Sequence, residues 1–135
     1  GFFAGNLIKR FGVLPVIGAG IVVLALGAMV ALHGVSVAHF VAALVLVGMG
    51  WNFMYTGGTV LLAESHTAAE KASAQGANDF LVFAVMGVSS ASSGALVASA
   101  GWTFMNWAAL VVLTLTAGMV LWYARVRPTL AAAHR

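Results

Sequence analysis

The chain has 135 residues, of which 62% are hydrophobic and 7% are charged. Soluble domains carry about a quarter charged residues, so this composition excludes an ordinary water-facing surface and predicts a membrane protein. The chain has no cysteine, which excludes disulfides, iron–sulfur clusters and thiolate metal sites. Its net charge of +3 comes from six scattered basic residues, which form no stripe of the kind that binds nucleic acid.

Two long intervals of the chain, residues 11–63 and 80–124, contain no Asp, Glu, Lys or Arg. A helix needs about 20 residues to cross ~30 Å of hydrocarbon, so each interval is long enough for two spans. Polar residues at 33–39 and a Ser-Ala-Gly-Trp sequence at 99–102 predict the turns that divide the intervals. The predicted spans are residues 13–32, 39–62, 79–98 and 103–124.

The expected fold is an all-α, polytopic membrane bundle of four transmembrane helices, formed by residues 1–135 as a single unit. The apolar runs are unbroken and lack the alternation of a barrel strand. All basic residues precede the first span, lie in the loop 64–78 or follow the last span in the tail 125–135. Four spans place these segments on one side, which the positive-inside rule makes cytoplasmic. The basic residues are Lys9, Arg10, Lys71, Arg125, Arg127 and Arg135.

Polar side chains are concentrated in the second and third predicted spans. In the second span Asn52, Tyr55, Thr56 and Thr59 follow helical spacing and are expected to form one stripe, which faces protein or a water-filled cavity rather than lipid. Asn52 either bonds a neighbouring helix or lines a pathway. In the third span, serine and glycine at four-residue spacing favour close helix packing.

Asp79 is the acidic residue nearest to the membrane interior, at the expected start of the third span. Such a position favours a helix cap beside the positive end of the helix dipole, with ion or proton coupling as the alternative. The four histidines lie in turns, loop or tail, where they do not match haem or metal ligation in a membrane bundle. The chain also lacks a buried Ser/His/Asp set and a phosphate-binding loop. We expect no enzyme activity, metal or cofactor.

Residues 5–12, Gly-Asn-Leu-Ile-Lys-Arg-Phe-Gly, resemble the G-x-L-x-D-R-x-G signature of the major facilitator superfamily (MFS). In that family the signature lies between helices two and three and recurs, more loosely, between helices eight and nine. The matching residues are Gly5, Leu7, Arg10 and Gly12. Lys9 replaces the aspartate, and the basic pair expected next is Val-Leu. The segments 50–53, 70–80 and 101–106 are also similar to helices ten to twelve of a bacterial subgroup.

The resemblance implies that the chain is the C-terminal third of a twelve-helix transporter in the bacterial cytoplasmic membrane. Missing N-terminal helices of the same chain and the lipid bilayer would be its partners. Helices ten and eleven, the second and third spans here, would line the central cavity. The expected substrate contacts are Trp51, Asn52, Tyr55, Thr56, Phe83 and Ser90. The expected conformational latch consists of Gly5, Arg10, Gly12, Glu64 and Glu70, with Arg10 pairing with one of the two glutamates.

Two functions remain open at this point. The first is secondary active transport of a small solute by alternating access, with a coupling proton or cation and Asp79 as the candidate coupling residue. The second is a stand-alone four-helix membrane anchor or assembly subunit. The first residue is Gly1 rather than methionine, which favours a piece of a longer chain.

Overall fold

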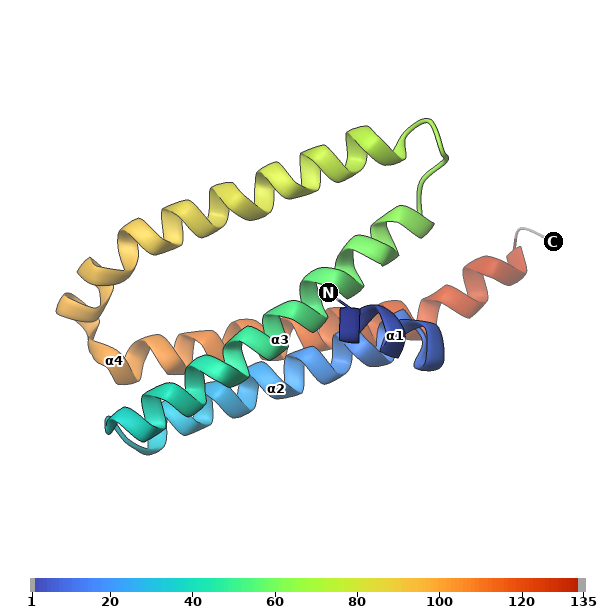
Figure 1. Cartoon of the computed structure of the whole chain (residues 1–135). Coiled ribbons are helices and arrows are strands. Elements are labelled where there is room, and N and C mark those ends of the chain that lie inside the picture. The colour runs from blue at the N-terminus through green and yellow to red at the C-terminus, as the bar shows by residue number, and fades with distance from the viewer. Residues whose placement is uncertain (1, 134–135) are drawn as a thin grey trace.

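The computed structural model describes the backbone of residues 2–133 and the side chains of residues 3–127. The helices are α1 (Phe2–Phe11), α2 (Val13–His33), α3 (Val37–Glu64) and α4 (Lys71–Ala133) (Figure 1). The described residues contain no strand, and the all-α fold class predicted from the sequence is confirmed. Helices α2, α3 and α4 are each long and apolar enough to cross a membrane.

Helix α4 is bent back on itself at Gly101, whose backbone has φ 83° and ψ 164°. Only glycine adopts this conformation readily, because a Cβ atom would clash with the backbone. The kink divides α4 into a first arm, residues 71–100, and a second arm, residues 102–133, which run in opposite directions (Figure 1). Together with α2 and α3, the arms give the four predicted spans. The turn expected at 99–102 is confirmed.

The turn between α2 and α3 lies within the polar segment that the sequence predicted, at residues 34–36. Ser36 caps α3 by accepting a 3.4 Å hydrogen bond from the backbone N–H of His39. This turn and the α4 kink lie at one end of the bundle (Figure 1). The α1–α2 junction, the loop 65–70 and the C-terminal part of α4 lie at the other end. The segments that carry five of the basic residues (Lys9, Arg10, Lys71, Arg125 and Arg127) therefore share one end, and Arg135 lies outside the described residues.

Helices α2 and α3 form the tightest pair in the structure. A Cβ atom added to Gly50 would lie 2.9 Å from the carbonyl oxygen of Gly20, and one added to Gly57 would lie 2.5 Å from Cγ1 of Ile17. Ile17 belongs to a buried cluster with Val13 and Ile21. Small residues that allow backbones to approach closely are the usual means of packing helices in a membrane.

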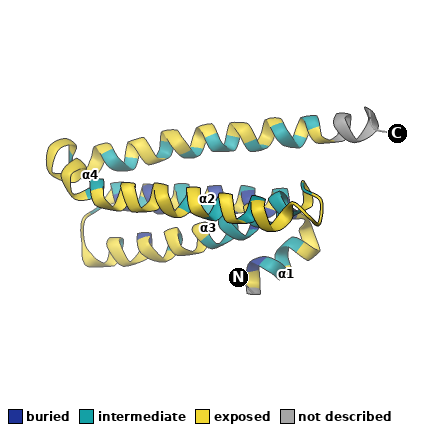
Figure 2. Cartoon of the chain, turned by 90° about the horizontal axis from the view of Figure 1, so that it is seen from above, coloured by how far each residue is buried: buried dark blue, intermediate teal, exposed yellow. Residues whose placement is uncertain are grey.

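The two arms of α4 differ in how they meet this pair. The second arm packs along α2, where Leu113, Ala117 and Val120 contact the buried cluster. At its start the indole N–H of Trp102 donates a 2.9 Å hydrogen bond to the carbonyl oxygen of Ala31, near the end of α2. The first arm runs apart from the other helices after its first turns (Figure 1). Nearly all its residues beyond position 82 are exposed (Figure 2).

The start of α4 corrects one expectation. Helix α4 begins at Lys71, so Asp79 lies two turns inside it and the cap assigned to Asp79 is wrong. The chain instead turns into the helix at Thr67, whose carbonyl oxygen accepts 3.0 Å hydrogen bonds from the N–H groups of Glu70 and Lys71. Only residues 65–70 of the predicted loop 64–78 are non-helical.

Replacing Gly50 with alanine tests the α2–α3 contact. The new methyl group would press on Gly20 backbone and on Leu24 Cγ, 2.6 Å away. We expect the free energy of unfolding to fall by about 1–3 kcal/mol, as for other overpacked sites, measured by reversible unfolding in mixed micelles. The matched control is Gly48→Ala on the same helix, where no atom lies within 4 Å of the added methyl group. Equal effects of the two substitutions would contradict the contact.

Candidate functional site

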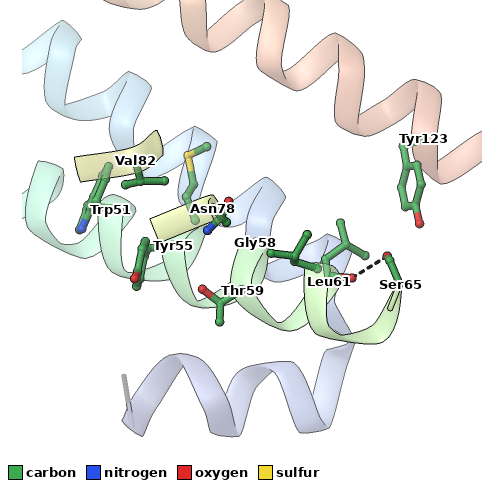
Figure 3. A pocket seen from close by; sticks show the side chains of 11 residues that line it. Trp51, Tyr55, Gly58, Thr59, Leu61, Ser65, Asn78, Val82 and Tyr123 are labelled. Carbon is green, nitrogen blue, oxygen red and sulfur yellow. Dashed lines mark hydrogen bonds between the residues drawn. The ribbon is translucent and has the colours of Figure 1, made fainter. Parts of the chain in front are cut away.

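A pocket of about 420 Å³ lies between α3, the first turns of the first arm and the second arm of α4 (Figure 3). It extends from Trp51, near the middle of α3, to Ser65 at the end of the bundle that carries the basic segments. Its volume falls within the range of small-molecule sites. Its lining residues are Trp51, Met54, Tyr55, Gly58, Thr59, Leu61, Leu62, Ser65, Asn78, Val82 and Tyr123.

Trp51 and Tyr55 form an aromatic pair in the wall of this pocket. They lie one turn apart on α3, so their side chains project from the same face of the helix. Their ring centroids are 5.8 Å apart and the ring planes differ by 16°, a stacked arrangement. Trp51 remains 42% exposed, which leaves part of the indole surface uncovered. Both residues were predicted as substrate contacts, and the structure brings them together.

A polar bridge joins α3 to the first arm beside the aromatic pair. The hydroxyl of Tyr55 donates a 3.0 Å hydrogen bond to Oδ1 of Asp79. The same oxygen accepts a 3.0 Å hydrogen bond from the Gln75 amide, and the Asn78 amide lies 3.5 Å away. Within the described residues, this is the one side-chain hydrogen bond between α3 and the first arm. It fixes the Tyr55 ring and the position of the arm at the same time.

The other predicted substrate contacts lie elsewhere. Asn52 lines a separate pocket of about 720 Å³ with Phe3 and neighbouring residues of α3, rather than the pocket that Tyr55 and Thr59 line. Thr56 is half-buried and does not line the pocket of Trp51. Phe83 is 61% exposed and Ser90 is also exposed, both on the part of the first arm that runs apart.

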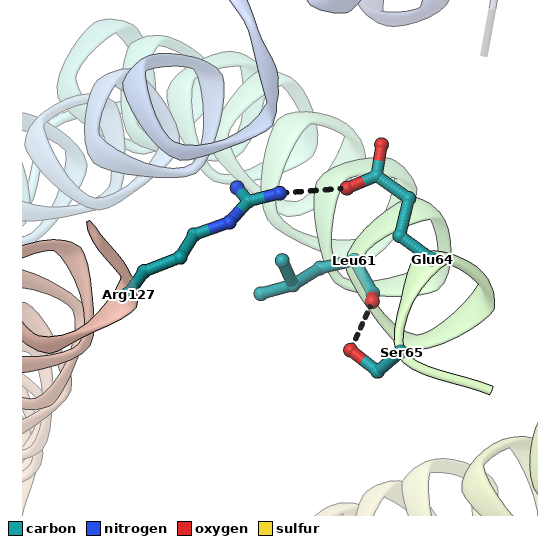
Figure 4. A network of polar contacts seen from close by, with 4 residues as sticks. All are labelled: Leu61, Glu64, Ser65 and Arg127. Carbon is teal, nitrogen blue, oxygen red and sulfur yellow. Dashed lines mark hydrogen bonds and ion pairs between the residues drawn. The ribbon is translucent and has the colours of Figure 1, made fainter. Parts of the chain in front are cut away.

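The residues of the expected latch gather at one end of the bundle, but the ion pair found there is a different one. Glu64 accepts a 3.3 Å hydrogen bond and ion pair from Arg127 of the second arm, and both side chains are about half exposed (Figure 4). The Arg10 guanidinium lies over the neighbouring ring of Phe11, 5.4 Å from its centroid. Gly12 has a φ of 90° and connects α1 to α2, a conformation that favours glycine.

Glu70 takes part in the start of α4 rather than in an ion pair with Arg10. The hydroxyl of Thr67 donates a 2.8 Å hydrogen bond to its carboxylate, and the backbone N–H of Thr67 donates a longer one of 3.4 Å. These two bonds, with a smaller effect of His66, hold the pKa of the Glu70 carboxyl below its ordinary value. This is part of a capping box, in which a threonine and a glutamate three residues later satisfy the helix start.

The sequence interpretation missed several residues of this site. Gln75, Asn78 and Val82 follow helical spacing and form the face of the first arm that meets α3, together with Asp79. The signal was present in the Thr67-Ala-Ala-Glu70 sequence, which forms the turn directly before the start of α4 at Lys71. Placing the start at position 79 left Gln75 and Asn78 in the predicted loop. Tyr123 and Arg127 had no comparable signal, because only packing of the second arm brings them near α3.

The contact between Thr67 and Glu70 predicts a pH effect at the start of α4. Because the pKa of Glu70 is lowered in the folded chain, the contact stabilises the helix start above the ordinary glutamate pKa and is lost as the pH falls through the lowered value. Thr67→Val removes the hydroxyl donor and should raise the Glu70 pKa, as measured by NMR titration of carboxyl-labelled glutamate. Thr114→Val is the control, because the Thr114 hydroxyl bonds the Leu110 carbonyl oxygen within its own helix. A Glu70 pKa unchanged by Thr67→Val would contradict the contact.

Comparison with known proteins finds relatives that are all named as transporters. The chain is 41% identical over 133 residues to the riboflavin transporter RfnT of Brucella anthropi. The aligned region covers 98% of this chain and 33% of that protein. It is 33% identical over 123 residues to the uncharacterized MFS-type transporter YddS of Bacillus subtilis, covering 90% of this chain and 28% of that protein. The MFS-type transporter YdeG of the same organism is 32% identical over 120 residues, covering 87% and 28%.

The chain thus spans about a third of the length of these relatives. No solved structure gives a significant match. The family model of the Major Facilitator Superfamily matches residues 1–135, which is the whole chain. The match confirms the resemblance seen in residues 5–12 and in the later segments. The chain belongs to the Major Facilitator Superfamily.

Proposed function

We propose that the chain contributes to secondary active transport of a small solute by alternating access. Its family and its relatives support membrane transport. Since the chain spans about a third of those relatives, it would act with further helices that complete the cavity. In this proposal α2, α3 and the two arms of α4 are the last four spans, in the bacterial cytoplasmic membrane, with the loop 65–70 and the tail on the cytoplasmic side.

The observation that carries the proposal is the pocket beside Trp51, Tyr55 and Asp79. Polar groups at this depth are costly next to lipid, so they are kept where they face protein or a solute pathway. The pocket extends from Trp51, near the middle of α3, to Ser65 at the end of that helix, and we expect a solute to move along it. Its walls come from three helical segments, so a relative movement of those segments would change its shape.

Asp79 is the candidate coupling residue in this proposal. Among the acidic side chains of the described residues, it is the one that accepts a hydrogen bond from a residue lining the pocket, Tyr55 of α3. Protonation would turn one acceptor oxygen into a donor and weaken the bonds from Tyr55 and Gln75. A proton or cation at Asp79 would in this way change how the first arm is held against α3.

Arg10 and the glutamates are proposed to act as a conformational latch at the cytoplasmic end. In the structure Glu64 is engaged by Arg127, and the Arg10 side chain is exposed. An exposed pair contributes only ~0–1 kcal/mol, which allows Glu64 to exchange partners during the transport cycle. In the alternate conformation Arg10 would take the place of Arg127.

The transport proposal is tested with the protein expressed from its complete reading frame and reconstituted in proteoliposomes. Riboflavin is the first solute to assay, because a relative with 41% identity is a riboflavin transporter. We expect riboflavin to accumulate when a proton gradient is imposed. Asp79→Asn should abolish accumulation while riboflavin exchange at equal concentrations continues, since the variant retains the acceptor oxygen but cannot titrate.

Two controls accompany this experiment. Asn106→Ala removes a polar side chain whose one hydrogen bond among the described residues goes to the Trp102 carbonyl oxygen of its own helix, and it should leave accumulation unchanged. A panel of unrelated small solutes distinguishes a wrong substrate from absent transport. If the wild-type protein moves none of them, the proposal of transport is wrong; if Asp79→Asn accumulates solute like the wild type, the coupling role of Asp79 is wrong.

The latch predicts a modest effect on transport rate. Arg10→Ala should change the rate by no more than about fivefold, the factor that corresponds to ~1 kcal/mol. Lys9→Ala removes the neighbouring exposed cation and serves as the control for a general effect of charge. A rate for Arg10→Ala equal to that of Lys9→Ala and of the wild type would rule out the latch.

A further inference from the structure

We propose that a groove between α2 and the second arm of α4 binds one anionic phospholipid, with an acyl chain in the groove and the phosphate beside Arg125. The lipid belongs to the leaflet at the basic end of the bundle, which the positive-inside rule makes the cytoplasmic one. The inference does not depend on the transport proposal. It rests on an apolar groove, a cation at the end of that groove, and an exposed tryptophan that marks the membrane interface.

The groove has a volume of about 430 Å³, and all the residues that line it are apolar. Gly18 of α2 and Ala117 and Ala124 of the second arm contribute little side-chain volume to its walls. A Cβ atom added to Gly18 would meet no atom within 4 Å, so the space at this position is open. Val22 and Leu121, which also line the groove, are each 59% exposed. An acyl chain in this groove contacts two helices at once, and these dispersion contacts hold it more firmly than a single helix face would.

The groove lies on the apolar side of the molecule. Helix α2 carries no hydrogen-bonding side chain from Val13 to Leu32. The polar contact between Tyr55 and Asp79 lies instead on α3 and the first arm. Polar side chains in a membrane face protein or water, whereas a wholly apolar surface costs nothing next to lipid. We therefore place a lipid, rather than a polar solute, at this groove.

Arg125 supplies a cation at the end of the groove. It lies one helical turn beyond Leu121, which in turn lies one turn beyond Ala117, so the three side chains project from the same side of the second arm. Arg125 is exposed and forms no ion pair with any residue that the structure describes. A guanidinium group can donate two parallel hydrogen bonds to a phosphate, which makes arginine well suited to this head group.

Trp122 places Arg125 at the depth of the lipid head groups. Its side chain is 66% exposed, and exposed tryptophans of membrane helices are concentrated at the interface between hydrocarbon and water. Arg125 follows three residues later, about 4.5 Å further along the helix axis. The groove residues Ala117 and Leu121 lie on the hydrocarbon side of Trp122. A phospholipid with its phosphate at Arg125 would therefore have its chain beside the groove.

The other charges at this end also favour an anionic ligand. Lys9 and Arg10 lie at the end of α1, directly before α2 begins (Figure 1). Glu64 is already paired with Arg127, and Glu70 is hydrogen-bonded within the turn that leads into α4. Basic groups beside a groove between membrane helices, on the cytoplasmic side, are the arrangement that binds anionic lipid head groups.

The experiment identifies the lipid at the groove itself. The protein from its complete reading frame carries the photoreactive residue benzoylphenylalanine in place of Leu121. It is reconstituted in vesicles with a minor fraction of phosphatidylglycerol in phosphatidylcholine of the same acyl chains, and illuminated. Mass spectrometry then gives the ratio of the two lipids attached to the probe. We expect phosphatidylglycerol to be enriched about fivefold over its ratio in the vesicle, the factor that one cation near the membrane surface supplies.

Two pairs of variants test the cation and the groove separately. Arg125→Gln should return the ratio to that of the vesicle, whereas Lys71→Gln, which removes a cation from the first arm at the same end, should leave the enrichment intact. Gly18→Leu fills the open space in the groove and should reduce the attached phosphatidylglycerol. Gly118→Leu is its control, because Gly118 has equally open surroundings on the second arm and does not line the groove.

The remaining outcomes would overturn the inference. A lipid ratio equal to that of the vesicle, or an enrichment that Arg125→Gln does not lower, would rule out the head-group site. Attachment of the probe to protein would mean that another helix of the complete chain, or a second copy of it, covers the groove. Equal losses in Gly18→Leu and Gly118→Leu would show that disturbed helices, and not a filled groove, cause the effect. Transport of a solute, or its absence, does not alter these readings.

Discussion

The structure depends on the close approach of α2 and α3 at Gly20 and Gly50. The backbone carbonyl of each glycine lies about where a Cβ atom on the other glycine would press against it. In a membrane, apolar side chains gain little by leaving lipid for protein, so helix pairs rely on close packing. This contact makes α2 and α3 one unit. The second arm of α4 packs on that unit through the buried cluster around Ile17. At the start of this arm, the indole of Trp102 donates a hydrogen bond to the Ala31 carbonyl oxygen near the end of α2.

The first arm of α4 is attached differently, and this difference bears on function. It meets α3 only over its first three turns, through one bond from Tyr55 to Asp79 and the packing of Val82. The pocket, the aromatic pair and the candidate coupling residue all lie at this junction. In the proposed function, a solute or a proton bound there would act on the contact between α3 and the first arm.

Much of the fold was predictable because the membrane allows few solutions. Uncharged stretches of this length can only be helices, and Gly101 could be placed in a turn because the second stretch was long enough for two spans. The candidate site was predicted only in part. Trp51 and Tyr55, two of the predicted substrate contacts, line one pocket, whereas Asn52, predicted with them, lines another. The turn from Thr67 to Glu70 that leads into α4 carries a capping sequence, but the sequence prediction began the helix at position 79 and therefore assigned Asp79 to a cap.

The sequence by itself determined the number of spans, the common end of the basic segments and the family. These properties follow from local hydropathy, charge and a short motif, which do not depend on how the helices pack. Only the tertiary structure decided which polar residues meet. The pairing of Glu64 with Arg127 and of Tyr55 with Asp79 depends on the rotation and spacing of helices far apart in the chain. Periodicity shows which residues share a face of one helix, but only packing decides what that face contacts.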